Sequence, residues 1–430
     1  MSIYTWIGLI GATIATFFPL LTRKKLQKDE RIAVIRNSFI LIGVLVSVFI
    51  LQINSFIVIV AALIAAVVLD KKTYTKKRLL IYGGIFVGVV ALFLFIFRTN
   101  PNYVTKHMLK HPETTSLYIA IDGEPVISHE SDVVRPLASV VKIVVALEYA
   151  YQVSEGTIDE NTEVLVEDLD KYYIKDTDGG AHPDWKEEEG LEDAETVSLK
   201  EVARGMITYS SNANTEYLID LLGAETINQR MKTENIEPHD EVYPIVSGLL
   251  VVAEEKRTSE DKDWLEKFST MDVTEYGNRA FEIHEQLKEG TYDTSGVDHL
   301  SLKEQRVWSD HLTGSTAEAY GELLHRFVTE DFDEEVNTIM HDLLRYGLES
   351  NPKNREYYEA IGTKGGSTAF IINQAMFIEM LDGTQYEFVI LTDDLSIFQM
   401  LLMSNNLNAF IVEFANDETF RKDAIDAFNE

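Results

Sequence analysis

The sequence predicts an α+β domain, an antiparallel sheet flanked by helices, that follows four N-terminal transmembrane helices. Two observations support this division. Residues 1–100 carry 12 Lys and Arg against 3 Asp and Glu, whereas the rest of the chain carries 26 against 67. Long apolar runs fill the basic part, while the acidic part alternates strand and helix patterns. The two parts are therefore expected in different solvents.

Apolar runs long enough to cross a bilayer occur at Ile3–Leu21 and Leu79–Phe97. Between them, Asn37–Leu69 is a single apolar block that is interrupted at Gln52–Ser55. As one helix, this block would extend roughly 50 Å against a hydrocarbon core of about 30 Å, so two short helices joined by a turn fit better. The four predicted spans are residues 3–21, 37–53, 54–69 and 79–97.

The basic loops at 22–31 and 71–78 indicate the orientation of these spans, because Lys and Arg are enriched on the cytoplasmic side. With both loops in the cytoplasm, the N-terminus and everything after Arg98 lie outside. No Lys or Arg precedes the first span, so the positive start of a cleaved signal peptide is missing. We expect a multi-pass protein of the cell membrane. Its acidic domain, residues 116–430, is extracytoplasmic and follows a polar linker at 99–115.

Composition excludes several kinds of chemistry. The sequence contains no cysteine, which removes disulfides, thiolate zinc sites and cysteine nucleophiles. The acidic domain would be repelled by phosphate backbones, so nucleic acid is not an expected partner. The ten histidines include no H-E-x-x-H pattern, and the nearest string, HEQLK at 284–288, lacks the second histidine. No metal and no cofactor are expected.

The first half of the acidic domain predicts a hairpin and two helices. Ser116–Ile127 alternates about an Asp-Gly turn and predicts a β-hairpin. Leu137–Tyr151 is apolar around most of its circumference, which is typical of a deeply buried helix. Val197–Leu222 predicts a helix that is capped by Ser198 and interrupted near Tyr209–Asn212.

The second half predicts strands and a helical end. Phe370–Met380 and Tyr386–Leu391 have strand patterns, and Leu395–Phe428 is helical in pattern. We expect the first and last strands of the domain to share one sheet. Residues 254–304 are crowded with charge and predict an insertion that contains a solvated helix around Val273–Leu287.

A serine followed three residues later by a lysine occurs three times, but only one pair suits catalysis. On a helix this spacing places both side chains on one face, and the lysine must be desolvated before it can act as a base. Ser139–Lys142 opens an apolar helix, whereas Ser259–Lys262 lies in an exposed charge run and Ser350–Lys353 contains a proline. The alternative for Ser139 is an ordinary helix start whose lysine reaches solvent.

Two later segments combine with this pair. Tyr209–Asn212 (YSSN) breaks a helical stretch, and Gly362–Thr368 (GTKGGST) leads into a strand. Taken singly, they are a helix-breaking turn and a glycine-rich strand entry. Together and in this order, the three segments resemble the S-x-x-K, S-D-N and K-T-G motifs of the class A β-lactamase and penicillin-binding-protein superfamily. The resemblance covers residues 115–428 and implies a β-lactamase/transpeptidase-like α+β domain that forms an acyl-enzyme.

The resemblance also implies a role for each matched polar residue. Ser139 would attack a carbonyl and become acylated, with Lys142 as the proton acceptor. Ser210 and Lys364 would relay a proton toward the leaving group and supply positive potential. Asn212 would bind the amide carbonyl of the substrate.

The strand after the second lysine would lie beside the substrate, with Gly366, Ser367 and Thr368 as substrate-binding residues. The backbone N–H groups of Ser139 and Ser367 would form the oxyanion hole. Gly365 stands where the family usually has a hydroxyl residue that helps to bind a carboxylate. This departure weakens the case for D-alanyl-D-alanine-type substrates and leaves an esterase- or amidase-like activity open.

The E-x-x-L-N loop that supplies the deacylating base in class A β-lactamases is missing between Asn212 and Lys364. The segment EPHDEVYPIVSG at 237–248 stands in its place, with Glu241 or the neighbouring Asp240 as a possible base for deacylation. Without such a base, an acyl-enzyme formed with a β-lactam would persist. Efficient β-lactam hydrolysis is therefore not expected.

We expect a membrane-anchored extracytoplasmic serine hydrolase that acts on amides or esters resembling β-lactams or cell-wall peptides. The alternative is a sensor of β-lactams or cell-wall fragments that is acylated but turns over poorly. The predicted cytoplasmic loops have only about ten residues each, so such a sensor would need a partner protein in the membrane, whose identity the sequence leaves unknown. A non-catalytic scaffold is disfavoured because all the matched polar residues are present.

His182 lies in a distinctive loop, TDGGAHPDW at 177–185. It has two interpretations, a metal ligand or second base on the one hand and a packed turn with Trp185 on the other. The packed turn is the favoured one.

Overall fold

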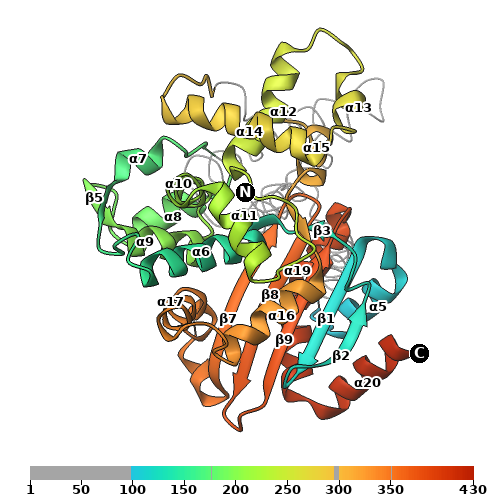
Figure 1. The fold of residues 1–430 in the computed structure, drawn as a ribbon. Coiled ribbons are helices and arrows are strands. Elements are labelled where there is room, and N and C mark those ends of the chain that lie inside the picture. The colour runs from blue at the N-terminus through green and yellow to red at the C-terminus, as the bar shows by residue number, and fades with distance from the viewer. Residues whose placement is uncertain (1–97, 176, 295–299, 350) are drawn as a thin grey trace, which may run out of the picture. The chain divides into compact units, whose positions relative to one another are not determined.

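The structure is a computed structural model, and it describes residues 98–430 apart from residues 176, 295–299 and 350 (Figure 1). The four predicted transmembrane spans lie outside the described residues. Among the helices of the described part, none combines the length and the apolar character that a membrane crossing requires.

A five-stranded antiparallel sheet with the strand order β2-β1-β9-β8-β7 forms the centre of the fold. The first strand pairs with the last, from Thr115 opposite Thr392 to Ile121 opposite Tyr386, which confirms that the two ends of the domain share one sheet. The predicted hairpin and both predicted C-terminal strands are confirmed. The strands are β1 (Thr115–Ile121), β2 (Glu124–His129), β7 (Tyr358–Ser367), β8 (Ile372–Met380) and β9 (Gln385–Thr392).

The two faces of this sheet are buried in two separate apolar clusters. Because side chains alternate along a strand, Leu117 and Ile119 of β1 enter one cluster while Tyr118 and Ala120 enter the other. The first cluster contains α19 (Ile397–Asn416) and α20 (Glu418–Asn429), so the closing helical stretch consists of two helices. The second contains α16 (Ala317–Val328), which crosses the other face (Figure 1). Full burial of one such aliphatic side chain stabilises the fold by about 1.5–3 kcal/mol.

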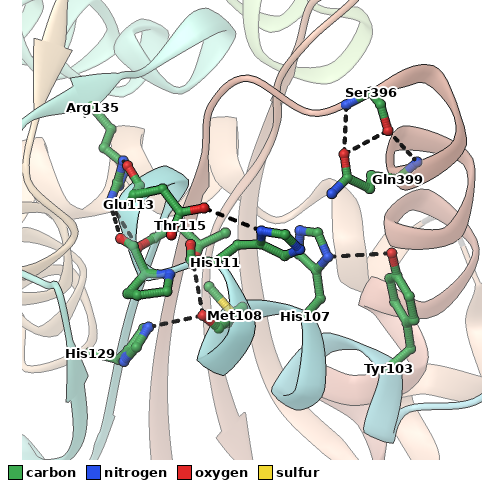
Figure 2. A network of polar contacts seen from close by, with 11 residues as sticks. Tyr103, His107, Met108, His111, Glu113, Thr115, His129, Arg135, Ser396 and Gln399 are labelled. Carbon is green, nitrogen blue, oxygen red and sulfur yellow. Dashed lines mark hydrogen bonds and ion pairs between the residues drawn. The ribbon is translucent and has the colours of Figure 1, made fainter.

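The segment predicted as a polar linker is instead a structured part of the domain. Residues 102–110 form α5 (Asn102–Lys110), with Val104 and Met108 completely buried. The buried guanidinium of Arg135 donates to the carbonyl oxygens of residues 112, 113 and 115, and His129 Nε2 lies 3.2 Å from the Met108 carbonyl oxygen (Figure 2). The linker prediction was wrong because the buried apolar positions are spaced by four within otherwise polar sequence.

Helices fill the rest of the second apolar cluster and carry most of the site. The predicted buried helix at Leu137–Tyr151 is confirmed as a 3₁₀ turn followed by a helix that begins at Lys142. The predicted cap is also confirmed, since the Ser198 hydroxyl accepts a hydrogen bond from the Glu201 N–H. These helices are α6 (Lys142–Ser154), α7 (Val166–Asp170), α8 (Ala181–Glu188), α9 (Leu199–Arg204), α10 (Asn212–Leu222), α11 (Ala224–Thr233) and α17 (Glu334–Leu344). Helix α18 (Tyr346–Glu349) instead contributes Leu348 to the first cluster.

The charged region at 254–304 is more than a solvated insertion. The predicted helix is present as α14, but Tyr276, Ile283 and Leu287 on one of its faces are buried against α12. Charged residues occupy its outer face, and their number masks the apolar stripe when the segment is judged by its overall charge. A third apolar cluster is thus formed by α12 (Ile245–Thr258), α13 (Trp264–Phe268), α14 (Val273–Lys288) and α15 (Leu302–Asp310). Two small sheets complete the fold, β3 (Arg135–Pro136) with β6 (Gly314–Ser315) and β4 (Glu163–Leu165) with β5 (Thr196–Ser198).

Candidate active site

Ser139 and Lys142 lie at the junction between the 3₁₀ turn Ala138–Val141 and helix α6. Ala138, directly before the serine, has a φ of 49°, in the left-handed region that costs an L-residue roughly 1–2 kcal/mol. The side chain of Lys142 is completely buried, with an exposure of 0%. The alternative of a helix-start lysine that reaches solvent is therefore wrong, and the lysine is held inside the domain.

The predicted break in the helix at Tyr209–Asn212 turns a second serine toward this lysine. After α9, a π-helical turn at Gly205–Tyr209 ends at Ser210, whose φ of 68° reverses the chain direction. Ser211 then caps α10 by accepting a hydrogen bond from the Asn214 N–H at 3.2 Å. π-turns are rare and occur frequently at functional sites. Ser210 and Asn212 therefore flank Ser211, the buried residue that caps α10.

The ammonium group of Lys142 makes three hydrogen bonds to this broken helix. Its Nζ atom lies 2.6 Å from the carbonyl oxygen and 3.1 Å from the hydroxyl oxygen of Ser210, and 2.8 Å from Oδ1 of Asn212. Lys364 Nζ donates to the same Ser210 hydroxyl at 3.0 Å and to the Gly365 carbonyl at 3.1 Å. The Ser210 hydroxyl oxygen is thus hydrogen-bonded to two buried lysines, and the three residues come from distant parts of the chain.

Burial shifts the proton equilibria of both lysines. The pKa of Lys142 falls well below its ordinary range, chiefly because burial penalises the charged form and then because Lys364 is a second cation nearby; Asp178 opposes the shift. Burial lowers the pKa of Lys364 to about 7. The lowered pKa favours the neutral form of Lys142, which is the state in which an amine accepts a proton.

Strand β7 passes unusually close to the Ser139 turn at Gly366. A Cβ atom at this position would lie 2.7 Å from the Leu137 carbonyl oxygen and 2.8 Å from the Ser139 backbone nitrogen. Only a glycine fits without displacing the backbone that carries the serine. Because β7 is the last strand in the sheet order, its outer edge is available for pairing with an extended ligand.

The two hydroxyl residues after this glycine differ in their surroundings. Ser367 ends β7 and is exposed. Thr368 instead contacts Ser309, with 2.9 Å between the two hydroxyl oxygens, and accepts a hydrogen bond from the Phe370 N–H. Of these two hydroxyl residues, Ser367 is therefore the one with the accessible side chain.

The segment considered for the deacylating base lies along β6, next to the strand that precedes Ser139. Asp240 accepts a hydrogen bond from the Gly314 N–H at 3.0 Å, and burial raises the pKa of its carboxyl group. Glu241 is exposed, and its backbone carbonyl accepts from Thr313. No hydrogen bond within the described residues joins either carboxylate to Ser139, and the role of Glu241 stays a prediction.

The expected packing of His182 with Trp185 is confirmed, with ring centroids 5.4 Å apart, but the local structure is helix α8 and not a turn. The ring is buried, and its two nitrogens face Ser211 at 3.0 Å and Asp170 at 2.9 Å. Asp170 also receives the Lys186 ammonium at 2.8 Å. Sequence reasoning singled out His182 but missed this link to the second serine motif. Neither residue's local pattern contains a signal for it.

A second group of titratable residues lies between α10 and α14. Asp220, His284 and Glu285 each place one ligand atom within 4.8 Å of the others. The Lys288 ammonium already lies 2.8 Å from Asp220. Burial opposes protonation of His284, but the hydrogen bonds with Asp220 and Glu216 prevail and raise its pKa to about 9. A protonated imidazole has no lone pair for a metal, so this cluster is read as a set of structural ion pairs.

A cavity of about 1190 Å³ opens at the C-terminal end of α6 and along α17, and it contains none of the matched site residues. Its lining includes the carboxylates of Asp159, Glu160, Glu334 and Asp342, of which Glu160 and Asp342 contact Lys200. A nucleophile with an adjacent base is the more informative feature for catalysis, so the candidate site is placed at Ser139.

Comparisons with known proteins give one match that covers most of the chain. Residues 102–417 match the model of the family described as the β-lactamase enzyme family. No curated protein matches.

Solved structures with similar folds include a β-lactamase from Chitinophaga pinensis, 12% identical over 73% of this chain and 99% of that one, with a TM-score of 0.45. A protein named PBP-A is 14% identical over 73% and 95%, with a TM-score of 0.45. A β-lactamase from Sphaerobacter thermophilus is 17% identical over 71% and 93%, with a TM-score of 0.42.

Proposed function

The chain belongs to the β-lactamase enzyme family, and from this membership and the geometry at Ser139 we propose that it is a serine hydrolase that forms an acyl-enzyme. The observation that carries the proposal is the buried Lys142–Ser210–Lys364 chain, in which one hydroxyl oxygen bridges two lysines with lowered pKa values. Structural ion networks pair lysines with carboxylates, whereas here the acceptors are hydroxyl, carbonyl and amide oxygens.

The acylation step uses these groups in sequence. The hydroxyl oxygen of Ser139 forms a bond to the substrate carbonyl carbon, and its proton passes to the neutral amine of Lys142. Ser210 then gives its own proton to the leaving nitrogen or oxygen and receives one from a lysine. When the carbon–leaving-group bond breaks, the acyl group stays on Ser139 and the lysine pair has returned its proton.

Charge develops on the carbonyl oxygen during this step and needs donors. The N–H groups of Ser139 and Ser367 are the proposed oxyanion hole, and the close approach of β7 at Gly366 supports it by bringing the two backbones together. Asn212, whose Oδ1 atom is held by Lys142, is proposed to orient a substrate amide with its Nδ2 group.

The proposed substrates are amides or esters that resemble β-lactams or cell-wall peptides. Release of the acyl group is proposed to be slow, because Glu241 is exposed and no hydrogen bond in the described residues ties it to the site. This favours the alternative proposal, a sensor that stays acylated. Anchoring by the four predicted spans, with the domain outside the cytoplasm, suits either function.

The proposal is tested by treating the 430-residue chain in detergent with a fluorescent penicillin and, separately, with a fluorophosphonate. Wild type should be labelled, Ser139→Ala should not, and Lys142→Ala should be labelled roughly 10²- to 10⁴-fold more slowly. Ser259→Ala, in a decoy pair of the same spacing, serves as the matched control and should behave as wild type. Labelling that survives in Ser139→Ala would overturn the proposal.

The lifetime of the label separates the two functions. A penicilloyl group that persists for hours, together with no turnover of test esters or amides, supports the sensor. Continuous release of product supports the hydrolase.

A further inference from the structure

Ser211 is the buried centre of the second serine motif. Its side chain has an exposure of 0%, and it lies between the two residues, Ser210 and Asn212, that contact Lys142. Its hydroxyl oxygen lies 3.0 Å from His182 Nδ1 and 3.1 Å from Asn214 Oδ1. An interaction that holds the Ser211 side chain in place therefore also holds Ser210 and Asn212 in place.

His182 reaches this serine from a different part of the chain. Its backbone N–H donates to Asp178 at 2.9 Å, and its Nε2 lies 2.9 Å from Asp170 Oδ1. Lys186 also contacts Asp170. The imidazole is enclosed by the rings of Tyr173 and Trp185, with centroids at 5.1 Å and 5.4 Å. The ring cannot turn without breaking at least one of these contacts.

Counting donors and acceptors shows which arrangement of protons satisfies every hydrogen bond from Asp170 through His182 and Ser211 to Asn214. Asn214 donates its Nδ2 group to the Val202 carbonyl, so its Oδ1 atom must accept from Ser211. The single hydroxyl proton of Ser211 is then used, and His182 Nδ1 must donate to the hydroxyl oxygen. Nε2 must donate as well, because Asp170 offers only acceptors. All partners are satisfied only when both ring nitrogens carry protons.

We propose that His182, held by Asp170, is a positioning residue that fixes Ser210 and Asn212 against Lys142 by donating a hydrogen bond to Ser211. The inference deepens the proposed function and rests on it. Removal of the imidazole leaves the Ser211 hydroxyl without this contact. The segment that carries Ser210 and Asn212 then loosens, and acylation slows. The charged group in contact with the ring is Asp170 on α7, which Lys186 on α8 also contacts, while Asp178 accepts from the His182 backbone N–H.

The test uses two substitutions that each keep one end of the imidazole. Asn places an amide near the position of Nδ1 and can still contact Ser211, whereas Gln places one near Nε2 and can contact only Asp170. We expect His182→Gln to slow penicillin acylation roughly 10- to 100-fold, since displacement of a reacting group by about 1 Å has effects of this size. His182→Asn should keep the larger part of the rate.

A second measurement does not depend on acylation. Hydrogen–deuterium exchange of peptides that cover residues 209–215 should be at least roughly tenfold faster in His182→Gln than in wild type, while peptides from β8 and β9 stay unchanged. Wild-type exchange at 209–215 in His182→Gln, or equal acylation rates for His182→Asn and His182→Gln, would overturn the inference. If His182→Gln fails to fold, His182→Asn decides, because it should keep acylation and exchange at 209–215 near the wild-type rates, and a large change in both would overturn the inference. Absence of labelling in wild type would reject the proposed function, and the exchange result would still judge the role of His182.

Discussion

Lys364 donates a hydrogen bond to Ser210 across 3.0 Å, although 154 positions separate the two residues in the chain. The contact brings the edge strand of the sheet to the broken helix, and Lys142 joins it from a third element. A hydroxyl group with two lysine donors can pass on its own proton and be supplied with another at once.

Acylation should fall as the pH rises through about 7, because Lys364 loses its positive charge there. Lys142 acts in the opposite sense, since its neutral form is the base and its lowered pKa keeps that form populated. A guanidinium stays charged throughout this range, so Lys364→Arg should be slower than wild type but lack the fall near pH 7. Stopped-flow labelling with a chromogenic β-lactam from pH 5 to 9 measures both profiles. Identical profiles would exclude Lys364 as the group that titrates.

The same lysine should make the folded state more stable at alkaline pH. Its pKa is about 7 in the folded chain and close to 10.4 when unfolded, so between these values the unfolded state binds more protons. The free energy of unfolding from this group therefore rises with pH, by on the order of 4 kcal/mol in total. Urea unfolding followed by tryptophan fluorescence should show this rise in wild type and a much smaller one in Lys364→Met. An equal rise in both would contradict the assignment.

Gly366→Ala should abolish most of the activity without unfolding the domain. The added Cβ would lie 2.8 Å from the Ser139 nitrogen and 2.7 Å from the Leu137 carbonyl oxygen, so the nucleophile or the strand must move. A loss of roughly 10²-fold in acylation rate is expected. Gly365→Ala is the matched control, because its Cβ would approach nothing nearer than 3.5 Å. Equal rates for the two variants would show that the close approach of β7 is unimportant.

Ala138 tests the strained turn before the nucleophile. Its φ of 49° is tolerated by a small side chain, but a β-branched residue is a genuine outlier there. Ala138→Val should lower the stability by on the order of 2 kcal/mol and slow acylation. In Ala138→Gly, relief of strain is offset by added freedom of the unfolded chain, so little change is expected. Thermal unfolding of both variants gives the comparison.

The predicted membrane topology can be tested by single cysteines, because the sequence contains none. Lys25→Cys lies in a predicted cytoplasmic loop, and Asp382→Cys lies on an exposed turn of the domain. A membrane-impermeant maleimide added to intact cells should label position 382 and reach position 25 only after lysis. Labelling of position 25 in intact cells would refute the predicted orientation.

Much of the fold follows from patterns that are local in the sequence. The hairpin at β1 and β2, the cap at Ser198 and the helix break before Asn212 all depend on residues within a few positions of one another. The linker prediction for 99–115 was wrong for the opposite reason. Helix α5 is stabilised by burial of Val104 and Met108 against distant elements, although its composition is mostly polar. The residues that follow it are held by Arg135, which donates to the carbonyl oxygens of residues 112 and 115.

The candidate site likewise combines features that are local in the sequence with features that depend on distant elements. The sequence alone determined the order and types of the polar residues, from Ser139 to Lys364, and the apolar helix that favours Ser139 over its two decoys. Only the tertiary structure decided that Lys142 is fully buried, that one Ser210 oxygen joins two lysines, and that His182 reaches Ser211. Spacing along a chain constrains neighbours on one element. Desolvation and hydrogen bonds between elements depend on how the whole chain packs.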